Sequence, residues 1–113
     1  MPIEFVANGS PKVVSRAIEE FARAQGHVTA IVVPWESDGT TLSMAVTAVK
    51  SDGWAIEHTN LGTIRLVDAG QDRTRVAIAA EVAAHPEATT LAAVFDLFAR
   101  QVQSRFHVES VDS

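Results

Sequence analysis

The chain has 113 residues, of which 47% are hydrophobic and 20% are charged, so composition excludes a disordered chain and predicts one domain with one core over residues 1–113. The formal net charge is −5, and the nine basic residues are scattered, which argues against nucleic acid and anionic membranes, because both need a concentrated positive patch. Without cysteine, disulfides and thiolate chemistry are excluded.

The sequence also bears on the compartment. The start at Met1 shows no basic segment followed by a long apolar run, which a signal peptide would require. No apolar stretch approaches the roughly 18 residues needed to span a bilayer. We therefore expect a cytoplasmic protein that does not enter a membrane.

The first elements are a short strand over residues 3–7 and a helix over residues 11–25. Ser10 offers an N-cap hydroxyl, Pro11 suits the first helical position and Gly26 suits the C-cap. An apolar stripe at helical spacing supports the helix. It consists of Val14, Ala17, Ile18, Phe21 and Ala24.

After Gly26 the hydrophobic period changes to two, which predicts strands. These strands cover residues 28–35, 40–49, 54–59, 63–68 and 74–84. The tripeptide Ser-Asp-Gly at 37–39 and again at 51–53 suits three-residue hairpins whose glycine is left-handed. That loop length predicts a register in which Val32 pairs with Met44, and Val46 pairs with His58.

Residues 68–72 form the next predicted turn, which sets Ile64 and Leu66 opposite Val76 and Ile78. The segment 60–62 predicts either a bulge in one long strand or a bend between two short strands. The sheet is therefore expected to have five or six strands.

The last predicted element is a helix over residues 86–107 that starts at Pro86. Its apolar stripe contains Leu91, Val94, Phe95, Phe98, Val102 and Phe106. A helix of about 20 residues is about 30 Å long and would cross the whole sheet. The predicted class is α+β, an antiparallel sheet with both helices packed on one face.

The order strand, helix, four or five strands, helix resembles the helix-grip architecture of the START and polyketide-cyclase-like superfamily and its shorter relative, the TATA-binding-protein-like fold. The segments that support the resemblance are 62–66 (GTIRL), 70–76 (GQDRTRV) and 98–102 (FARQV). The superfamily often places Thr-Arg-Val after a glycine-containing turn, before the last helix. The resemblance implies a sheet that grips the C-terminal helix, and it implies no catalytic residue, because the matching motif forms only a hairpin.

The first functional hypothesis is the binding of a small apolar ligand between the sheet and the C-terminal helix. The predicted register places polar His58 and Asn60 in line with an apolar lining. The candidate ligand-binding residues are His58, Asn60, Met44, Trp54, Ile56, Phe95 and Phe98. The bland interpretation of His58 is a half-buried histidine near the end of the sheet.

Two other functions stay open. The outer sheet face is expected to contain Ile31, Val33, Trp35, Ala45, Val49, Val67, Ala77 and Ala79, mixed with Thr29, Thr47, Thr59 and Arg65. A face left to water is normally more polar, so a homodimer through this face is the second hypothesis. The third is an enzyme of the cyclase or isomerase type that uses His58 as its acid or base.

The remaining motifs give little support for catalysis. No two histidines lie four residues apart on a predicted helix, and none lies in an acidic cluster, so we predict no metal site. The glycines form neither a dinucleotide fingerprint nor a phosphate loop, and no serine elbow is present. We predict no cofactor and no catalytic residues, and we favour a binding protein over an enzyme.

Overall fold

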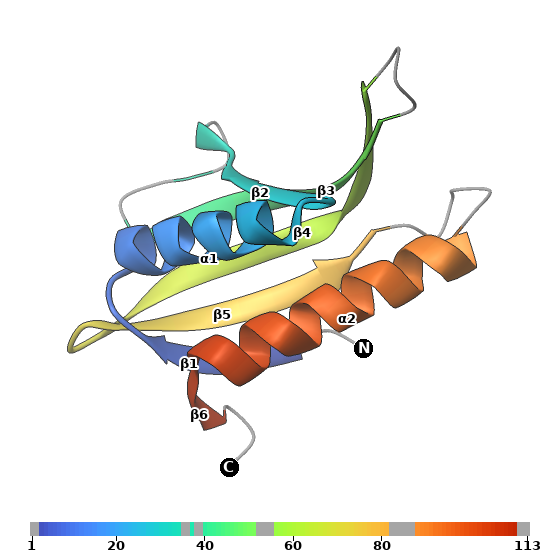
Figure 1. The fold of residues 1–113 in the computed structure, drawn as a ribbon. Helices are drawn as coiled ribbons and strands as arrows, with labels where there is room; N and C mark the ends of the chain where they lie inside the picture. The colour runs from blue at the N-terminus through green and yellow to red at the C-terminus, as the bar shows by residue number, and fades with distance from the viewer. Residues whose placement is uncertain (1–2, 35–36, 38–39, 52–55, 82–87, 111–113) are drawn as a thin grey trace.

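The computed structural model describes residues 3–34, 37, 40–51, 56–81 and 88–110, with the backbone alone described at 50–51, 56–58, 88 and 107–110. In chain order the elements are β1 (Ile3–Asn8), α1 (Pro11–Gln25), β2 (Val28–Val32), β3 (Thr41–Ser51), β4 (Ile56–Gly70), β5 (Arg73–Ala80), α2 (Ala88–Phe106) and β6 (His107–Ser110). The strands form one sheet in the order β2-β3-β4-β5-β1-β6, and both helices lie on one face of it (Figure 1). The predicted α+β class and element order are confirmed.

Helix α1 has the predicted bounds because its caps satisfy the backbone groups at both ends. The Ser10 hydroxyl accepts the N–H of Val13 at 3.4 Å, and Pro11 occupies the first turn. At the other end Gly26 has a φ of 83° and its N–H donates to the carbonyl of Arg23. The left-handed φ favours glycine, so the helix stops at this position.

Rows of inward side chains hold the sheet together. One row runs across the strands through Val32, Met44, Ile64, Ile78 and Ile3. Its three central members are at most 1% exposed. The row confirms the predicted pairing of Val32 with Met44 and the predicted register between β4 and β5, although β2 ends at Val32 rather than at residue 35.

The predicted register between β3 and β4 is wrong, by three residues where it pairs His58 and by four where it pairs Val46. Val46 pairs with Gly62, not with His58, and His58 pairs with Val49. The prediction extended the register from an assumed three-residue loop, whereas the observed pairs align Met44 with buried Ile64. Burial of the apolar rows therefore outweighed the turn preference that was used to count the register.

Strand β4 is one continuous strand with a bulge, as the first of the two alternatives predicted. The pairing shifts between Val46 and Thr47, so Leu61 is the extra residue, and it is fully buried. Beyond the bulge, residues 56–60 pair with β3 alone. This end of β3 and β4 forms an arm that curves away from the rest of the sheet (Figure 1).

The C-terminal helix was predicted over 86–107, and the structure corrects its end. Residues 86 and 87 lie outside the described part of the chain, and α2 ends at Phe106. His107 already belongs to β6, which pairs with the free edge of β1. The unpredicted strand gives the sheet its sixth member, and its four residues are too short for periodicity to reveal.

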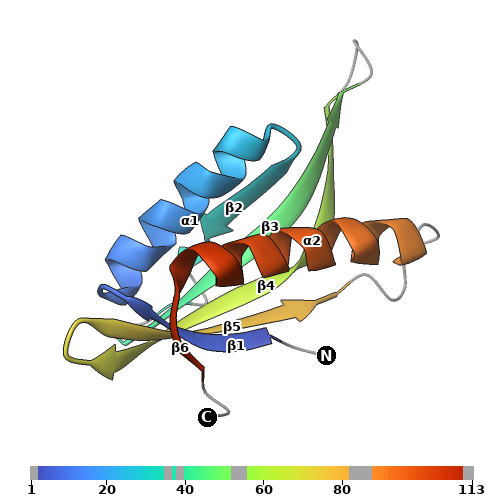
Figure 2. The same cartoon turned by 60° about the horizontal axis from the view of Figure 1, so that its bottom comes forward.

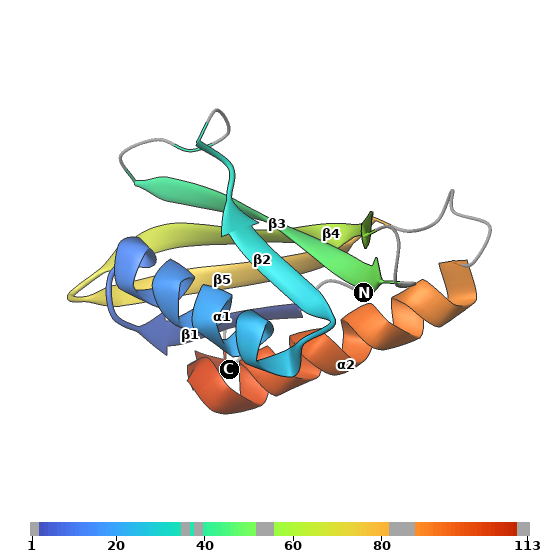
Figure 3. The same ribbon diagram turned by 45° about the horizontal axis from the view of Figure 1, so that its top comes forward.

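The two helices divide the inner face of the sheet between them (Figure 2 and Figure 3). Helix α1 packs mainly on β2, whereas α2 packs on β1, β4 and β5. The helices meet where the ring of Phe21 stacks on Phe98, with 6.0 Å between centroids, and meets Phe106 edge-on at 6.3 Å. Arg105 lies over the Phe21 ring, 5.5 Å from its centroid, so aromatic and cation–π contacts join α1 to α2.

The position of α2 depends on a glycine in the sheet, Gly62. Ala30, Val46, Gly62 and Ala80 follow one another across β2, β3, β4 and β5. A Cβ atom on Gly62 would lie 2.8 Å from the ring atom Cζ of Phe95 and closer still to the carbonyl oxygen of Ala79. The Phe95 ring therefore reaches the sheet only because position 62 has no side chain.

We expect Gly62→Ala to lower the free energy of unfolding by about 1–3 kcal/mol, because α2 and β5 must both move to admit a methyl group. Urea unfolding followed by far-ultraviolet circular dichroism measures the change. The control is Asn60→Ala, two residues away at an exposed position, which we expect to change stability by about 0.5 kcal/mol or less. Equal effects of the two substitutions would contradict this account of Gly62.

Candidate functional site

A groove of about 520 Å³ opens between the N-terminal half of α1 and the sheet, where β2 ends, β3 begins and β4 approaches its end. We call it the α1 groove. Its lining residues are Ser10, Pro11, Lys12, Ser15, Arg16, Glu19, Val32, Thr40, Thr41, Leu42 and Asp68. The volume lies within the range of about 300–1,000 Å³ that is typical of small-molecule sites.

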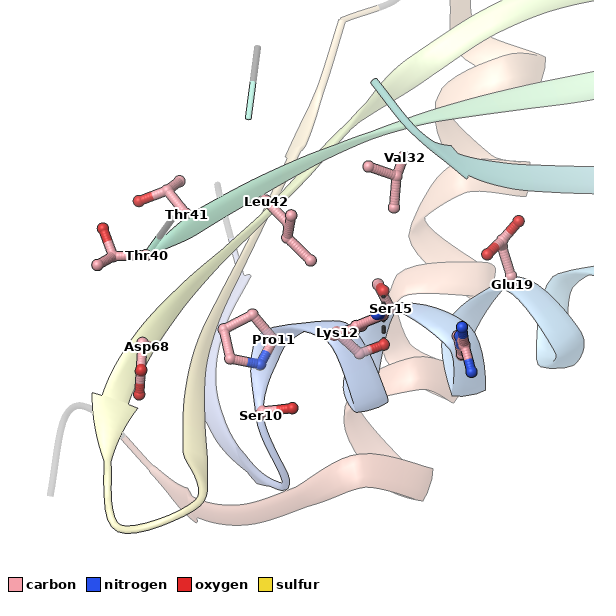
Figure 4. A pocket seen from close by; sticks show the side chains of 11 residues that line it. Ser10, Pro11, Lys12, Ser15, Glu19, Val32, Thr40, Thr41, Leu42 and Asp68 are labelled. Carbon is pink, nitrogen blue, oxygen red and sulfur yellow. Dashed lines mark hydrogen bonds between the residues drawn. The ribbon is translucent and has the colours of Figure 1, made fainter. Parts of the chain in front are cut away.

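The apolar part of the groove comes from both of its walls. Val32 and Leu42 are half-buried and point from the sheet toward α1, where Pro11 faces Leu42 (Figure 4). Ser15 lies on the helical wall of the groove. It is 3% exposed, and its hydroxyl donates to the carbonyl of Lys12 at 2.8 Å. A small side chain at this inward position leaves the space that a larger one, such as Ile18 one turn later, would fill.

Long-range hydrogen bonds fix the helical wall. The N–H of Gly9, just before the N-cap, donates to the carbonyl of Asp72 at 2.5 Å. The hydroxyl of Thr74 donates to the carbonyl of Gly9 at 2.7 Å, and Thr74 is fully buried. These bonds tie the start of α1 to the turn between β4 and β5, so that the N-terminal turn cannot move independently of the sheet.

A serine fixes the sheet wall. The hydroxyl of Ser37 donates to the carbonyl of Val33 at 2.8 Å and accepts the N–H of Ser43 at 3.1 Å. The N–H of Val33 also donates to the carbonyl of Ser43 at 2.8 Å. Val32 and Leu42 stand directly beside these bonds, so the groove is preformed on both sides.

The groove has a negatively charged residue at each end and two positively charged residues between them. Asp68 and Glu19 lie at its opposite ends (Figure 4), and Lys12 and Arg16 come from the turns of α1 between them. Within the described part of the chain, neither Lys12 nor Arg16 forms an ion pair with a carboxylate. The first turn of α1 contains no acidic residue, although a negative charge there would be favourable to the helix dipole.

The groove differs from the site that the sequence predicted. Met44, Phe95 and Phe98 are at most 4% exposed and belong to the main hydrophobic core, which fills the space between the sheet and the two helices. A smaller hollow of about 200 Å³ remains beside α2, and it is lined by Ile3, Ile78, Ala80, Ala92, Phe95, Asp96 and Ala99. Of the candidate residues whose side chains the structure describes, only Phe95 lines it.

The other candidates lie on the curved arm of β3 and β4 or outside the described residues. Asn60 is exposed, and its amide nitrogen donates to a carboxylate oxygen of Glu81 at 3.3 Å. Ile56 and His58 are described by their backbone alone, and Trp54 lies outside the described residues. A role of His58 in binding or catalysis stays a prediction. The register that placed His58 beside Val46 no longer supports it, because His58 pairs with Val49.

Comparisons with known proteins and a search for metal ligands and membrane-spanning helices do not narrow the function of this protein further. No protein-family model, curated protein or solved structure matches the chain. Among the side chains that the structure describes, no three histidine or acidic residues gather as metal ligands would. The helices in the described part of the chain are too short or too polar to cross a bilayer.

Sequence reasoning missed the α1 groove because its lining comes from four separate elements. The sequence patterns indicate Pro11 only as a helix start and Val32 only as the partner of Met44 in the sheet. One local signal was available, namely a first helical turn with a lysine and no acidic residue. Such a turn opposes the usual preference for negative charge at a helix start.

We expect Lys12→Gln to raise the free energy of unfolding by about 0.3–1 kcal/mol, because the substitution removes a positive charge from the helix start and a like charge four residues before Arg16. Urea unfolding at low ionic strength measures the gain, and high salt should abolish it. The control is Arg75→Gln on an exposed site of β5, where we expect no gain. A loss of stability in Lys12→Gln would contradict this reading of the helix start.

Proposed function

We propose that this protein is a non-catalytic binding domain for a small, largely apolar ligand, and that the ligand occupies the α1 groove. The proposal keeps the function expected from the sequence and moves its site from α2 to α1. The observation that supports it best is a preformed groove of about 520 Å³ with Val32 and Leu42 as an apolar surface. Polar groups at its margin would fix the ligand's orientation, as in most small-molecule sites.

The arrangement of the elements is compatible with this proposal. A strand, a helix, a meander of strands and a second helix on one sheet face form the order for which the helix-grip architecture is known, and we propose that relationship for this chain. Fold alone does not determine function. The groove, rather than the fold, is therefore the basis of the proposal.

We expect small aliphatic and aromatic probes to raise the melting temperature of the protein, because a ligand that binds only the folded state stabilises it by mass action. Val32→Trp, which fills the groove with an indole ring, should abolish that shift. Val13→Trp is the matched control, since Val13 is 59% exposed on α1 and does not line the groove. The measured quantity is the probe-dependent shift for each variant relative to its own melting temperature without probe.

Two results would count against ligand binding in the α1 groove. If no probe shifts the melting temperature of the wild-type protein, the binding function is wrong. If Val32→Trp and Val13→Trp respond to probes alike, a ligand binds elsewhere on the molecule.

A homodimer through the outer sheet face is the second candidate. Ile31 is 54% exposed there, next to half-buried Ala45 in the register. Arg65 and Glu4 flank Ala77 on its two sides, so a two-fold axis along β5 would place Arg65 of each copy over Glu4 of the other. This candidate ranks second because the two Arg75 side chains would meet near that axis.

If the outer face forms a dimer, Ile31→Lys should shift the protein toward monomer in analytical ultracentrifugation, because a charge would be buried without a partner. Leu97→Lys is the control, since Leu97 is equally exposed, at 58%, but lies on α2. A wild-type protein that sediments as a monomer at high concentration would eliminate the dimer.

A further inference from the structure

The α1 groove contains two positive side chains on one side of a helix. Lys12 and Arg16 are four residues apart on α1, so their Cβ atoms are neighbours on the helix surface. Both line the groove, and both are exposed. Long basic side chains that start one helical turn apart can converge on one acceptor group, and an arginine can bind a carboxylate through two parallel hydrogen bonds.

The pair is unfavourable for the protein without a ligand. Like charges four residues apart repel each other, and a lysine in the first turn opposes the helix dipole. Neither side chain forms an ion pair with a described carboxylate. An anion between the two side chains would relieve both effects at once, whereas a neutral ligand would relieve neither.

The ends of the groove restrict the charge of the ligand further. Asp68 and Glu19 lie at its two ends (Figure 4), and each would repel a second negative group on the same molecule. The surface between the ends is apolar at Val32 and Leu42. The lining therefore favours one negative charge between the two ends of the groove, near Lys12 and Arg16, and an uncharged remainder.

We propose that the ligand of the α1 groove is a singly charged amphipathic anion, a carboxylate whose head group is bound by Lys12 and Arg16 and whose apolar part lies on Val32 and Leu42. The inference rests on the proposed function, because it names the class of ligand for that same groove. It assigns the two basic residues the role of head-group recognition and the two sheet residues the role of apolar contact.

The test uses three probes with one alkyl chain and different head groups, namely decanoate, decanol and decylammonium, below their micelle concentrations. Two-dimensional amide spectra of the full chain report both the affinity and the location of each probe. We expect decanoate to shift the amide signals of residues 12–19 and 40–42 and to bind about tenfold more tightly than decanol, a factor that one charge-assisted contact accounts for. Decylammonium should bind most weakly, and added salt should weaken decanoate alone.

A pair of double variants separates specific recognition from net charge. Lys12→Gln with Arg16→Gln should weaken decanoate binding about tenfold and leave decanol unchanged. Arg65→Gln with Arg75→Gln removes the same amount of charge from exposed positions of the outer sheet face, and we expect it to leave decanoate binding unchanged. Both variants keep the groove's apolar residues, so decanol binding also reports that the groove is intact.

The possible failures are distinguishable. If decanol or decylammonium binds the groove as tightly as decanoate, or if both double variants weaken decanoate equally, the head-group assignment is wrong and the binding function stands. If no probe shifts the amides of residues 12–19 and 40–42, both the assignment and the proposed function are wrong.

Discussion

The contact between Phe95 and the backbone at Gly62 determines how the rest of this molecule is arranged. The Phe95 ring can reach the sheet only where a side chain is missing, and Gly62, next to Ala80 in the register, provides that place. Once Phe95 is seated, Phe98 meets Phe21 of the other helix. Helix α2 is thereby fixed both to the sheet and to α1.

This packing decides where a ligand has room. The large side chains of α2 pack over β1, β4 and β5, and the hollow that the described residues leave beside α2 is about 200 Å³, against about 520 Å³ for the α1 groove. The N-terminal half of α1 directs smaller groups, such as Pro11 and Ser15, toward the sheet. Close packing is maintained where the side chains are large and fails where they are small, which explains why the groove lies under the start of α1.

The α1 groove also shows a conflict between local stability and binding. Ser10 caps α1, yet Lys12 places positive charge in the first turn, where the helix dipole is least favourable to it, and Arg16 adds a like charge four residues later. A sequence selected for stability alone would place an acidic residue in this turn. Such local conflicts are expected at functional sites, where the compensation comes from a ligand or from the rest of the fold.

Local patterns in the sequence determined a large part of the fold. The bounds of α1 follow from Ser10, Pro11 and Gly26, and the pairing of Val32 with Met44 follows from the length of the loop at residues 37–39, because capping and tight turns act over short distances. The strand β6, the register between β3 and β4, and the groove could be decided only in three dimensions. Each depends on segments far apart in sequence: β6 on the free edge of β1, the register on the alignment of Met44 with Ile64, and the groove on the meeting of α1 with the ends of β2, β3 and β4.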